Sequence, residues 1–216
     1  MFDSIVLTLG FEPGPLISAV ASAAAEGFSE KARIVVFTAG FPEERSERAW
    51  LQLQQVIGMM ELEKKLGIKL EKHEVPLDDM ASAVLYIKRV LDGLKDGYVK
   101  VSVTGGMRAL GLALFTAYLL IDWAREPKVE VYLEGRGLAL SVPSIRGVLS
   151  TRLTDAHTEV LRSMKPGEVY SPTDLAGLLK KDRSTIYRHF QVLFEMGLLE
   201  KMPEGYKLSR LGMLFQ

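Results

Sequence analysis

The stretch from Lys100 to Asp122 reads KVSVTGGMRALGLALFTAYLLID, and it decides the fold. A short β-branched run is followed by Thr104-Gly105-Gly106-Met107-Arg108 and then by an apolar segment of helical length. This is the pattern of a buried parallel strand that ends in a glycine turn and opens a helix. The glycines let a ligand approach the backbone, the free N–H groups of a helix start attract anions, and Arg108 offers a guanidinium suited to phosphate. We therefore expect an anion or nucleotide site, in the place where open α/β sheets bind ligands.

The residues around this stretch alternate between strand-like and helix-like segments. The alternation predicts a mostly parallel sheet with helices on both faces. Fold preference places the first strand beside the fourth, so that the turns after them face one crevice. The expected strands are Ile5–Leu9, Arg33–Phe37, Ile68–Val75 and Tyr98–Val103, followed by a terminal hairpin of Val129–Glu134 and Leu138–Val142. Four helices are expected: one that ends near Glu26, one over Glu43–Leu66, one that ends at Leu94 and one over Ala109–Ile121.

Two further turns support a ligand site at the same edge. Leu9-Gly10-Phe11 and Thr38-Ala39-Gly40-Phe41 also end strands with small, turn-forming residues. Neither has the spacing of a G-x-G-x-x-G dinucleotide fingerprint, and the chain has no G-x-x-x-x-G-K-[ST] loop, which argues against NAD and P-loop chemistry. An alternative stays open, in which the glycines serve only strand–helix packing and Arg108 forms a surface ion pair.

Composition excludes several classes of function. The 216 residues contain no cysteine, so disulfides and Cys-based zinc sites are excluded. The three histidines lack metal-ligand spacing, and no metal or cofactor is expected. The N-terminus has no basic leader, and the apolar segment Ala109–Ile121 is shorter than the ~20 residues of a membrane span. We expect a cytoplasmic protein with no membrane contact.

The pattern changes after Pro143. We expect a first domain over residues 1–143, a linker over 144–152 and a second domain over 153–216. The second domain begins with a helix capped by Thr154, a helix opened by Ser171-Pro172, and a helix that starts near Arg183 and ends at Gly197. A two-strand wing follows, and residues 151–216 hold 10 basic and 8 acidic residues. The residues of the third helix that are expected to point inward are Ile186, Phe190, Leu193 and Phe194.

The string D-L-A-x-x-L-x-x-x-x-S-T-x-x-R-x-F-x-x-L-x-x-x-G-L-L, from Asp174 to Leu199, resembles the winged helix-turn-helix of bacterial and archaeal regulators. In such modules the second helix of the pair enters the major groove of double-stranded DNA. An alternative is a winged helix used only for protein contacts. The resemblance implies DNA contacts from Arg183, Ser184, Thr185, Tyr187, Arg188 and Gln191 on the recognition helix, and from Lys201, Lys207 and Arg210 in and after the wing.

The G-F turn after the first strand, the T-G-G-M-R turn after the fourth and the winged helix together resemble the CRISPR-associated CARF-domain transcription regulators (CARF means CRISPR-associated Rossmann fold). The resemblance implies a Rossmann-like sheet and a homodimer that binds cyclic oligoadenylate, typically the tetra-adenylate, across its two-fold axis. The last-strand region, Glu134 to Arg136, is a candidate for a further contact. The ligand-binding residues implied are Leu9, Gly10, Phe11, Thr38, Gly40, Phe41, Thr104, Gly105, Gly106, Met107 and Arg108.

Two other functions remain open at this point. Some CARF proteins cleave their ligand by positioning the ribose 2′-hydroxyl, which needs little beyond geometry and a cation. No histidine is expected near the turns as a general base, so we expect a regulator rather than an enzyme. The third possibility is a metabolite-sensing repressor that binds another phosphorylated ligand. The operator, the direction of regulation and the ring size of the ligand do not follow from the sequence.

Overall fold

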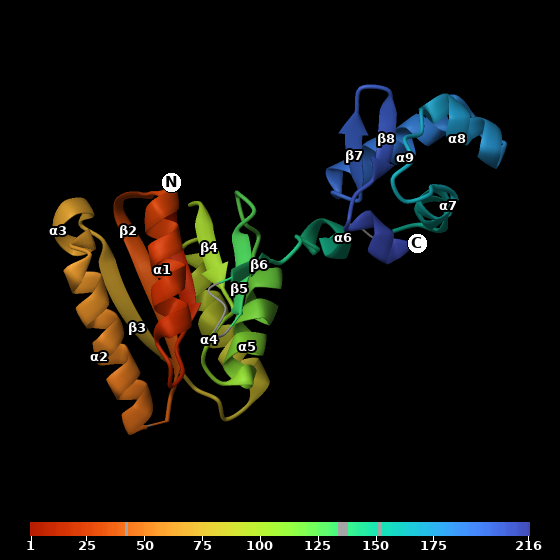
Figure 1. Cartoon of the computed structure of the whole chain (residues 1–216). Helices are drawn as coiled ribbons and strands as arrows, with labels where there is room; N and C mark the ends of the chain where they lie inside the picture. Colours follow the sequence, from red (N-terminus) through yellow and green to blue (C-terminus); the bar gives the residue numbers. More distant parts are fainter. Residues whose placement is uncertain (42, 134–137, 151–152) are drawn as a thin grey trace. The chain divides into compact units, whose positions relative to one another are not determined.

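The computed structural model describes residues 1–41, 43–133, 138–150 and 153–216. The chain forms two compact units, Met1–Val142 (unit 1) and Pro143–Gln216 (unit 2), and each is described by itself. Unit 1 is an α/β sheet structure and unit 2 is a small helical structure with a two-strand wing (Figure 1). The fold class expected from the sequence is confirmed.

Unit 1 is built on a six-stranded sheet with the order β3-β2-β1-β4-β5-β6. All neighbouring strands are parallel except β5 and β6. Because β1 lies between β2 and β4, the carboxyl ends of these three strands meet at one edge, as the first and fourth strands were expected to do. The strands are β1 (Phe2–Thr8), β2 (Phe28–Ala39), β3 (Lys69–Val75), β4 (Val99–Ser102), β5 (Lys128–Leu133) and β6 (Leu138–Ser141).

Helices cover both faces of this sheet. On one face Ile5 and Leu7 of β1 pack with residues of α1 (Gly14–Glu26), α2 (Glu44–Met59) and α3 (Leu62–Leu66). On the other face Val6 packs with α4 (Met80–Asp92) and α5 (Arg108–Leu119). A strand that is buried on both faces has a continuous run of apolar residues in its sequence. Such runs, IVL at residues 5–7 in β1 and IVVF at residues 34–37 in β2, allowed both strands to be predicted.

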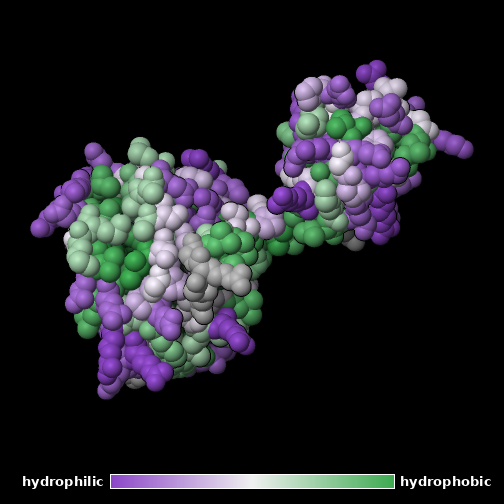
Figure 2. Space-filling view, viewed as in Figure 1, coloured by the Kyte–Doolittle hydropathy of each residue, from purple (hydrophilic) through white to green (hydrophobic). Residues whose placement is uncertain are grey.

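Several element ends differ from the expectation by one to three residues, and two differ by more, each with a local cause. β2 begins at Phe28 rather than Arg33, because Ser29 Oγ donates to Asp3 Oδ1 (2.7 Å) and holds the polar start of β2 beside β1. The helix expected over Glu43–Leu66 is broken at Met60 and Glu61, where Glu61 has φ +54°. The outer face of α2 is charged, and its first turns are purple at the lower left of Figure 2.

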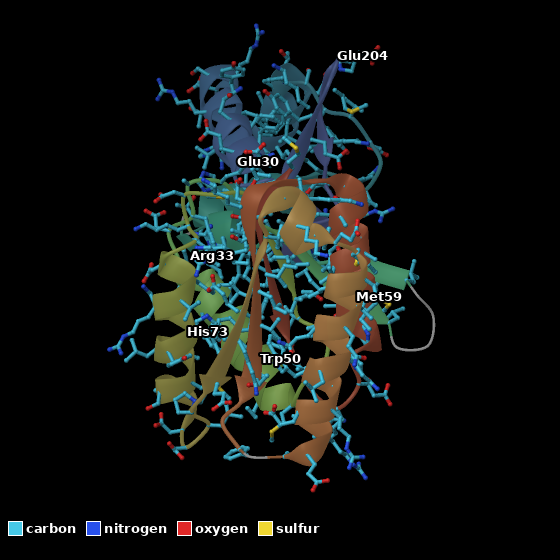
Figure 3. All side chains as sticks on the ribbon, turned by 90° about the vertical axis from the view of Figure 1, so that its left-hand side faces the viewer. Glu30, Arg33, Trp50, Met59, His73 and Glu204 are labelled. Atoms are coloured by element: carbon cyan, nitrogen blue, oxygen red, sulfur yellow. The ribbon has the colours of Figure 1, made fainter. Side chains whose placement is uncertain are left out.

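The β3 edge of the sheet is polar on both sides (Figure 3). On the α4 side His73 lies beside Tyr86, with ring centroids 6.4 Å apart, and Arg33 forms an ion pair with Glu71 (2.7 Å). On the α2 side Trp50 lies under the Lys72 ammonium. Charged groups of this kind protect an exposed sheet edge from pairing with another strand.

A charged cluster lies beneath α1. The Lys100 side chain is fully buried, and its Nζ lies 2.8 Å from Glu26 Oε1 and 2.9 Å from Glu130 Oε2. Lys128 contacts the same two carboxylates at 2.8 Å each. Although burial acts to raise it, hydrogen bonds from Lys100 and Lys128 lower the pKa of Glu26 to about 2. The two lysines and two glutamates therefore form one mutually neutralised cluster.

Unit 2 packs three main helices against a wing. Its elements are α6 (Arg146–Ser150), α7 (Asp155–Ser163), α8 (Pro172–Leu179), α9 (Arg183–Glu195), β7 (Leu199–Met202), β8 (Gly205–Leu208) and the 3-10 helix η1 (Gly212–Phe215). Thr154 caps α7 as expected, and His157 completes a capping box with it. The core contains Ile186, Phe190 and Leu193 of α9.

Two details of unit 2 differ from the sequence interpretation. Phe194 was expected to point inward and is 41 % exposed; its ring lies at the margin of the core, 6.1 Å from the Tyr206 ring, whereas Ile186, Phe190 and Leu193 are the fully buried residues of α9. The segment expected as a linker contains the short helix α6. Ile145 and Val148 of that segment pack against the core of unit 2.

Candidate functional site

Two glycine turns of unit 1 touch each other at the carboxyl edge of the sheet. A Cβ atom on Gly10, after β1, would lie 2.6 Å from the nitrogen of Gly106, after β4. Thr8 Oγ1 donates to the Gly105 carbonyl oxygen at 2.8 Å and holds the two turns together. Gly105 and Gly106 both have positive φ (+89° and +78°), a conformation that side chains disfavour. These glycines are therefore required for the turns to meet.

The turn after β4 leads into a helix start that is free to bind an anion. The N-cap residue of α5 is Met107, and it makes no side-chain capping bond, so the first N–H groups of the helix have no side-chain acceptor there. Arg108 is the first residue of α5 and is exposed. Among the described residues, no carboxylate lies within ion-pair distance of Arg108. Backbone donors and one cation thus face the same place.

An apolar hollow adjoins these donors. The turn Thr104–Arg108 forms one side of it, and Phe115 and Leu112 of α5 form another. Val131, Leu133 and Val142 complete the lining. Small-molecule sites commonly combine an apolar wall with a few convergent polar groups, which is the combination found here.

A smaller hollow connects the three turns. It is lined by residues that follow β1, β2 and β4, among them Gly10, Phe11, Phe41 and Met107. Phe11 and Phe41 are each 49 % exposed, and the Arg45 guanidinium of α2 lies 6.0 Å from the centre of the Phe11 ring. The turns after β1, β2 and β4 thus form one continuous edge surface.

The two threonines expected to bind ligand have their side chains inside the fold. Thr104 Oγ1 accepts a hydrogen bond from the Tyr132 N–H at 2.6 Å and is thereby engaged in joining β4 to β5. Thr38 is 2 % exposed, and among the described residues its Oγ1 has no hydrogen-bond partner. Gly40 and Phe41 line a separate hollow with Thr38, between β2 and the start of α2.

Sequence reasoning missed several lining residues of this edge. Phe115 lies seven residues after Arg108, so the helical repeat of α5 could have placed both on one face. Tyr132 and Val142 belong to the hairpin that the sequence predicted, but their place beside the turn after β4 depends on the pairing of β4 with β5, for which the sequence held no specific signal. Glu134 to Arg136, considered as a further contact, lie outside the described residues.

In unit 2, the exposed residues at the start of α9 form one surface. Arg183, Ser184, Tyr187 and Arg188 are exposed and line a single hollow on that helix. Thr185 is half-buried beneath them. Among the described residues, neither arginine is within ion-pair distance of a carboxylate, so this surface carries two available cations.

The remaining residues expected to contact DNA differ in how available they are. Lys201 and Arg210 are exposed and, within the described part of the chain, lie in no ion pair. Lys207 Nζ lies 3.0 Å from Glu200 Oε2. Gln191 is half-buried, and its Nε2 donates to the Tyr206 hydroxyl at 2.9 Å. The side-chain amide of Gln191 is therefore occupied by the wing.

A histidine pair joins α7 to α9. The rings of His157 and His189 meet edge to face, with centroids 5.0 Å apart. Burial lowers the pKa of both, and His157 is lowered further by His189. The described residues contain no cluster of three or more potential metal ligands, and among them no helix has the length and hydrophobicity needed to cross a membrane.

The comparisons with known families agree with this division of the chain. The family described as the Csa3 CRISPR-associated Rossmann-like domain matches residues 3–143. The bacterial regulatory protein, arsR family, matches residues 157–201, which contain most of α7, the whole of α8 and α9, and the start of the wing. No curated protein matches the sequence. The two domains together are those of a CRISPR-associated transcriptional regulator, and the chain belongs to the family of the Csa3 CRISPR-associated Rossmann-like domain.

Proposed function

We propose that the protein is a ligand-responsive regulator of CRISPR-Cas genes that binds cyclic oligoadenylate, with the tetra-adenylate as the expected form, across a homodimer of unit 1. In this proposal unit 2 binds double-stranded DNA. The observation that carries it is the edge of unit 1, where two touching glycine turns come together with a helix start that has no side-chain cap and with Arg108, which forms no ion pair with any described carboxylate.

The chemistry of that edge suits a ligand with phosphates and bases. Backbone N–H groups and Arg108 would meet the phosphates. The apolar wall of Phe115, Val131 and Leu133 would meet a base, because such a surface gains most from covering a flat apolar group. A sugar phosphate would leave this wall uncovered, which favours a nucleotide ligand over the alternative of a simple phosphorylated metabolite.

The homodimer is supported by an exposed apolar surface beside the same hollow. Leu112 of α5, Leu120 directly after α5, and Leu138 and Leu140 of β6 are each 50–58 % exposed. Figure 2 shows hydrophobic colour over α5 on the right-hand side of unit 1. Surfaces of this kind on a soluble protein commonly mark an interface. A second copy would cover them and would bring two copies of the ligand site to one symmetric ligand.

Cleavage of the ligand is the weaker alternative. Arg108 could stabilise developing charge on a phosphate. However, none of the described residues that line the hollows around Gly106 is a histidine, and His73 lies on β3 toward α4. A general base would have to come from elsewhere, so binding without cleavage is the function we propose.

A thermal-shift assay tests the ligand. Cyclic tetra-adenylate should raise the melting temperature, whereas sugar phosphates and AMP should not. Arg108→Ala should abolish the shift, and the matched control Arg89→Ala, an exposed arginine on α4, should retain it. Absence of any shift with wild-type protein would contradict the ligand assignment. Linear products after incubation would instead establish cleavage.

DNA binding is tested by the salt dependence of affinity. Arg188→Ala should weaken binding to every duplex and reduce the slope of log K against log salt by about one, as expected when one phosphate contact is lost. Arg108→Ala should leave binding in the absence of ligand unchanged. If Arg188→Ala binds all duplexes as tightly as wild type, then α9 is not the DNA-contacting helix.

A further inference from the structure

Tyr206 lies where the wing, α9 and the segment before α8 meet. It is buried, and its N–H donates to the Tyr170 carbonyl oxygen at 2.9 Å while its own carbonyl accepts from the Tyr170 N–H at 2.8 Å. Its ring packs against Phe190 and Phe194 of α9, with centroids 4.9 and 6.1 Å away. Tyr206 thus attaches the wing to α9 and to the segment that leads into α8.

Next to Tyr206, the backbone of the wing is in direct contact with the backbone of the segment before α8. A Cβ atom on Gly205 would lie 2.3 Å from the Tyr170 carbonyl oxygen, so the hairpin is in direct backbone contact there. The ring of Tyr206 is apolar, and its hydroxyl is the single polar atom that the side chain offers to α9. That hydroxyl accepts the hydrogen bond from Gln191 Nε2.

Gln191 would otherwise belong to the DNA-contacting face of α9. It lies three residues after Arg188, four after Tyr187 and seven after Ser184, which is the spacing of one helical face. Its neighbours on that face are exposed, whereas Gln191 is half-buried and directed to the wing. The amide keeps a second N–H, but its bond to the Tyr206 hydroxyl directs it toward the wing and away from the two-bond contact that a glutamine makes with a base edge.

We propose that Gln191 and Tyr206 are positioning residues that fix the wing relative to the recognition helix, and that Gln191 reads no base. This inference rests on the proposed function of unit 2 in DNA binding. Lys201 lies directly opposite Tyr206 in the hairpin, so the placement of Tyr206 determines that of the Lys201 cation, which has no ion-pair partner in the described part of the chain. In this proposal, α9 can contact the groove while Lys201 contacts a phosphate only if the hydrogen bond between Gln191 and Tyr206 is intact.

The test compares Gln191→Ala, Tyr206→Phe and the double variant. The probes are duplexes enriched from a random-sequence pool by the wild-type protein, together with one unselected duplex of the same length. Each variant should weaken binding about three- to tenfold, the range of one hydrogen bond. The double variant should be no weaker than either single variant, because both changes remove the same bond.

Two readouts separate positioning from base reading. Loss of a wing–phosphate contact should lower the salt slope by about one and weaken selected and unselected duplexes alike. Loss of a base contact would reduce the preference for the selected duplex, and only in Gln191→Ala. Tyr170→Phe is the matched control, since its hydroxyl bonds Glu168 and the Lys165 N–H rather than α9 and its removal should change neither readout.

The outcomes are distinct. Equal, non-additive losses with a reduced salt slope support the inference, provided that far-UV circular dichroism shows that the variants are folded. Additive losses, a specificity change confined to Gln191→Ala, or a Tyr206→Phe variant indistinguishable from Tyr170→Phe would overturn it. If Arg188→Ala weakens binding while Tyr206→Phe does not, this inference alone fails. If the wild-type protein binds no duplex, the proposed function fails with it.

Discussion

Replacing Gly10 with alanine should force apart the two turns that form the edge site of unit 1. The added Cβ would lie 2.6 Å from the Gly106 nitrogen, about 0.8 Å short of the 3.4 Å at which ordinary contact begins. Both partners are backbone, so neither can rotate away. The hydrogen bond from Thr8 Oγ1 to Gly105 resists displacement of the second turn. Overpacking of this kind costs about 1–3 kcal/mol of unfolding free energy.

The two tryptophans allow unit 1 to be followed by itself. Trp50 and Trp123 both lie within residues 1–142, and the sequence has only these two, so their fluorescence reports unfolding of unit 1 without a contribution from unit 2. In urea, the fluorescence midpoint of Gly10→Ala should fall with an unchanged slope. In a thermal scan the same change corresponds to roughly 2–12 °C.

Gly58→Ala is the matched control for this experiment. Gly58 is exposed near the end of α2, and an added Cβ would have no atom within 4 Å. Alanine is the better helix former, so this variant should gain about 0.5–1 kcal/mol. If Gly10→Ala is as stable as Gly58→Ala, the two turns do not approach as closely as described and the argument for a shared edge site is lost.

Three further predictions concern charged groups. Lys100→Met should lower the stability of unit 1 by about 3 kcal/mol in the fluorescence assay, because it leaves the buried Glu130 with Lys128 alone. Glu26 has a folded-state pKa of about 2, below its ordinary 4.5, so wild-type unit 1 should lose stability as pH falls from about 4.5 towards 2, and Glu26→Gln should lose less over that range. His157 and His189 have lowered pKa values, so the neutral forms stabilise unit 2; its stability, measured by far-UV circular dichroism, should fall as pH drops below 6.5, and His189→Gln should weaken this dependence.

Much of unit 1 could be predicted because the sequence patterns of its strands, turns and helices lie within short, continuous stretches of the chain. The run from Lys100 to Asp122 was read as a strand, a turn and a helix, and in the structure it holds all of β4 except Val99, and the whole of α5. The pairing of β1 with β4 followed from the preference for right-handed crossovers. The glycine turns could be placed at one edge for the same reason, since parallel strands end on the same side.

The features that could not be predicted depend on contacts between distant residues. Lys100 is the second residue of β4, where a lysine would ordinarily reach solvent, yet it is fully buried and paired with Glu26 of α1 and Glu130 of β5. Gln191 shares a helical face with Arg188, and only the position of Tyr206 shows that its amide is engaged. The helix break at Glu61 contains no proline and had no sequence signal.

The proposed ligand site and the start of the DNA-binding unit are adjacent along the chain. Val142 is the last residue of unit 1, and it lines the apolar hollow beside Arg108. Its N–H donates to the Val129 carbonyl oxygen at 2.9 Å, so the sheet holds it in place. Pro143 follows and restricts the backbone of Val142 to extended conformations, so a shift at Val142 is poorly absorbed at that residue. A ligand in the hollow would therefore contact Val142, the last residue of unit 1, directly. Ligand binding could then reach the junction with unit 2 without a chain of side-chain contacts through the core of unit 1.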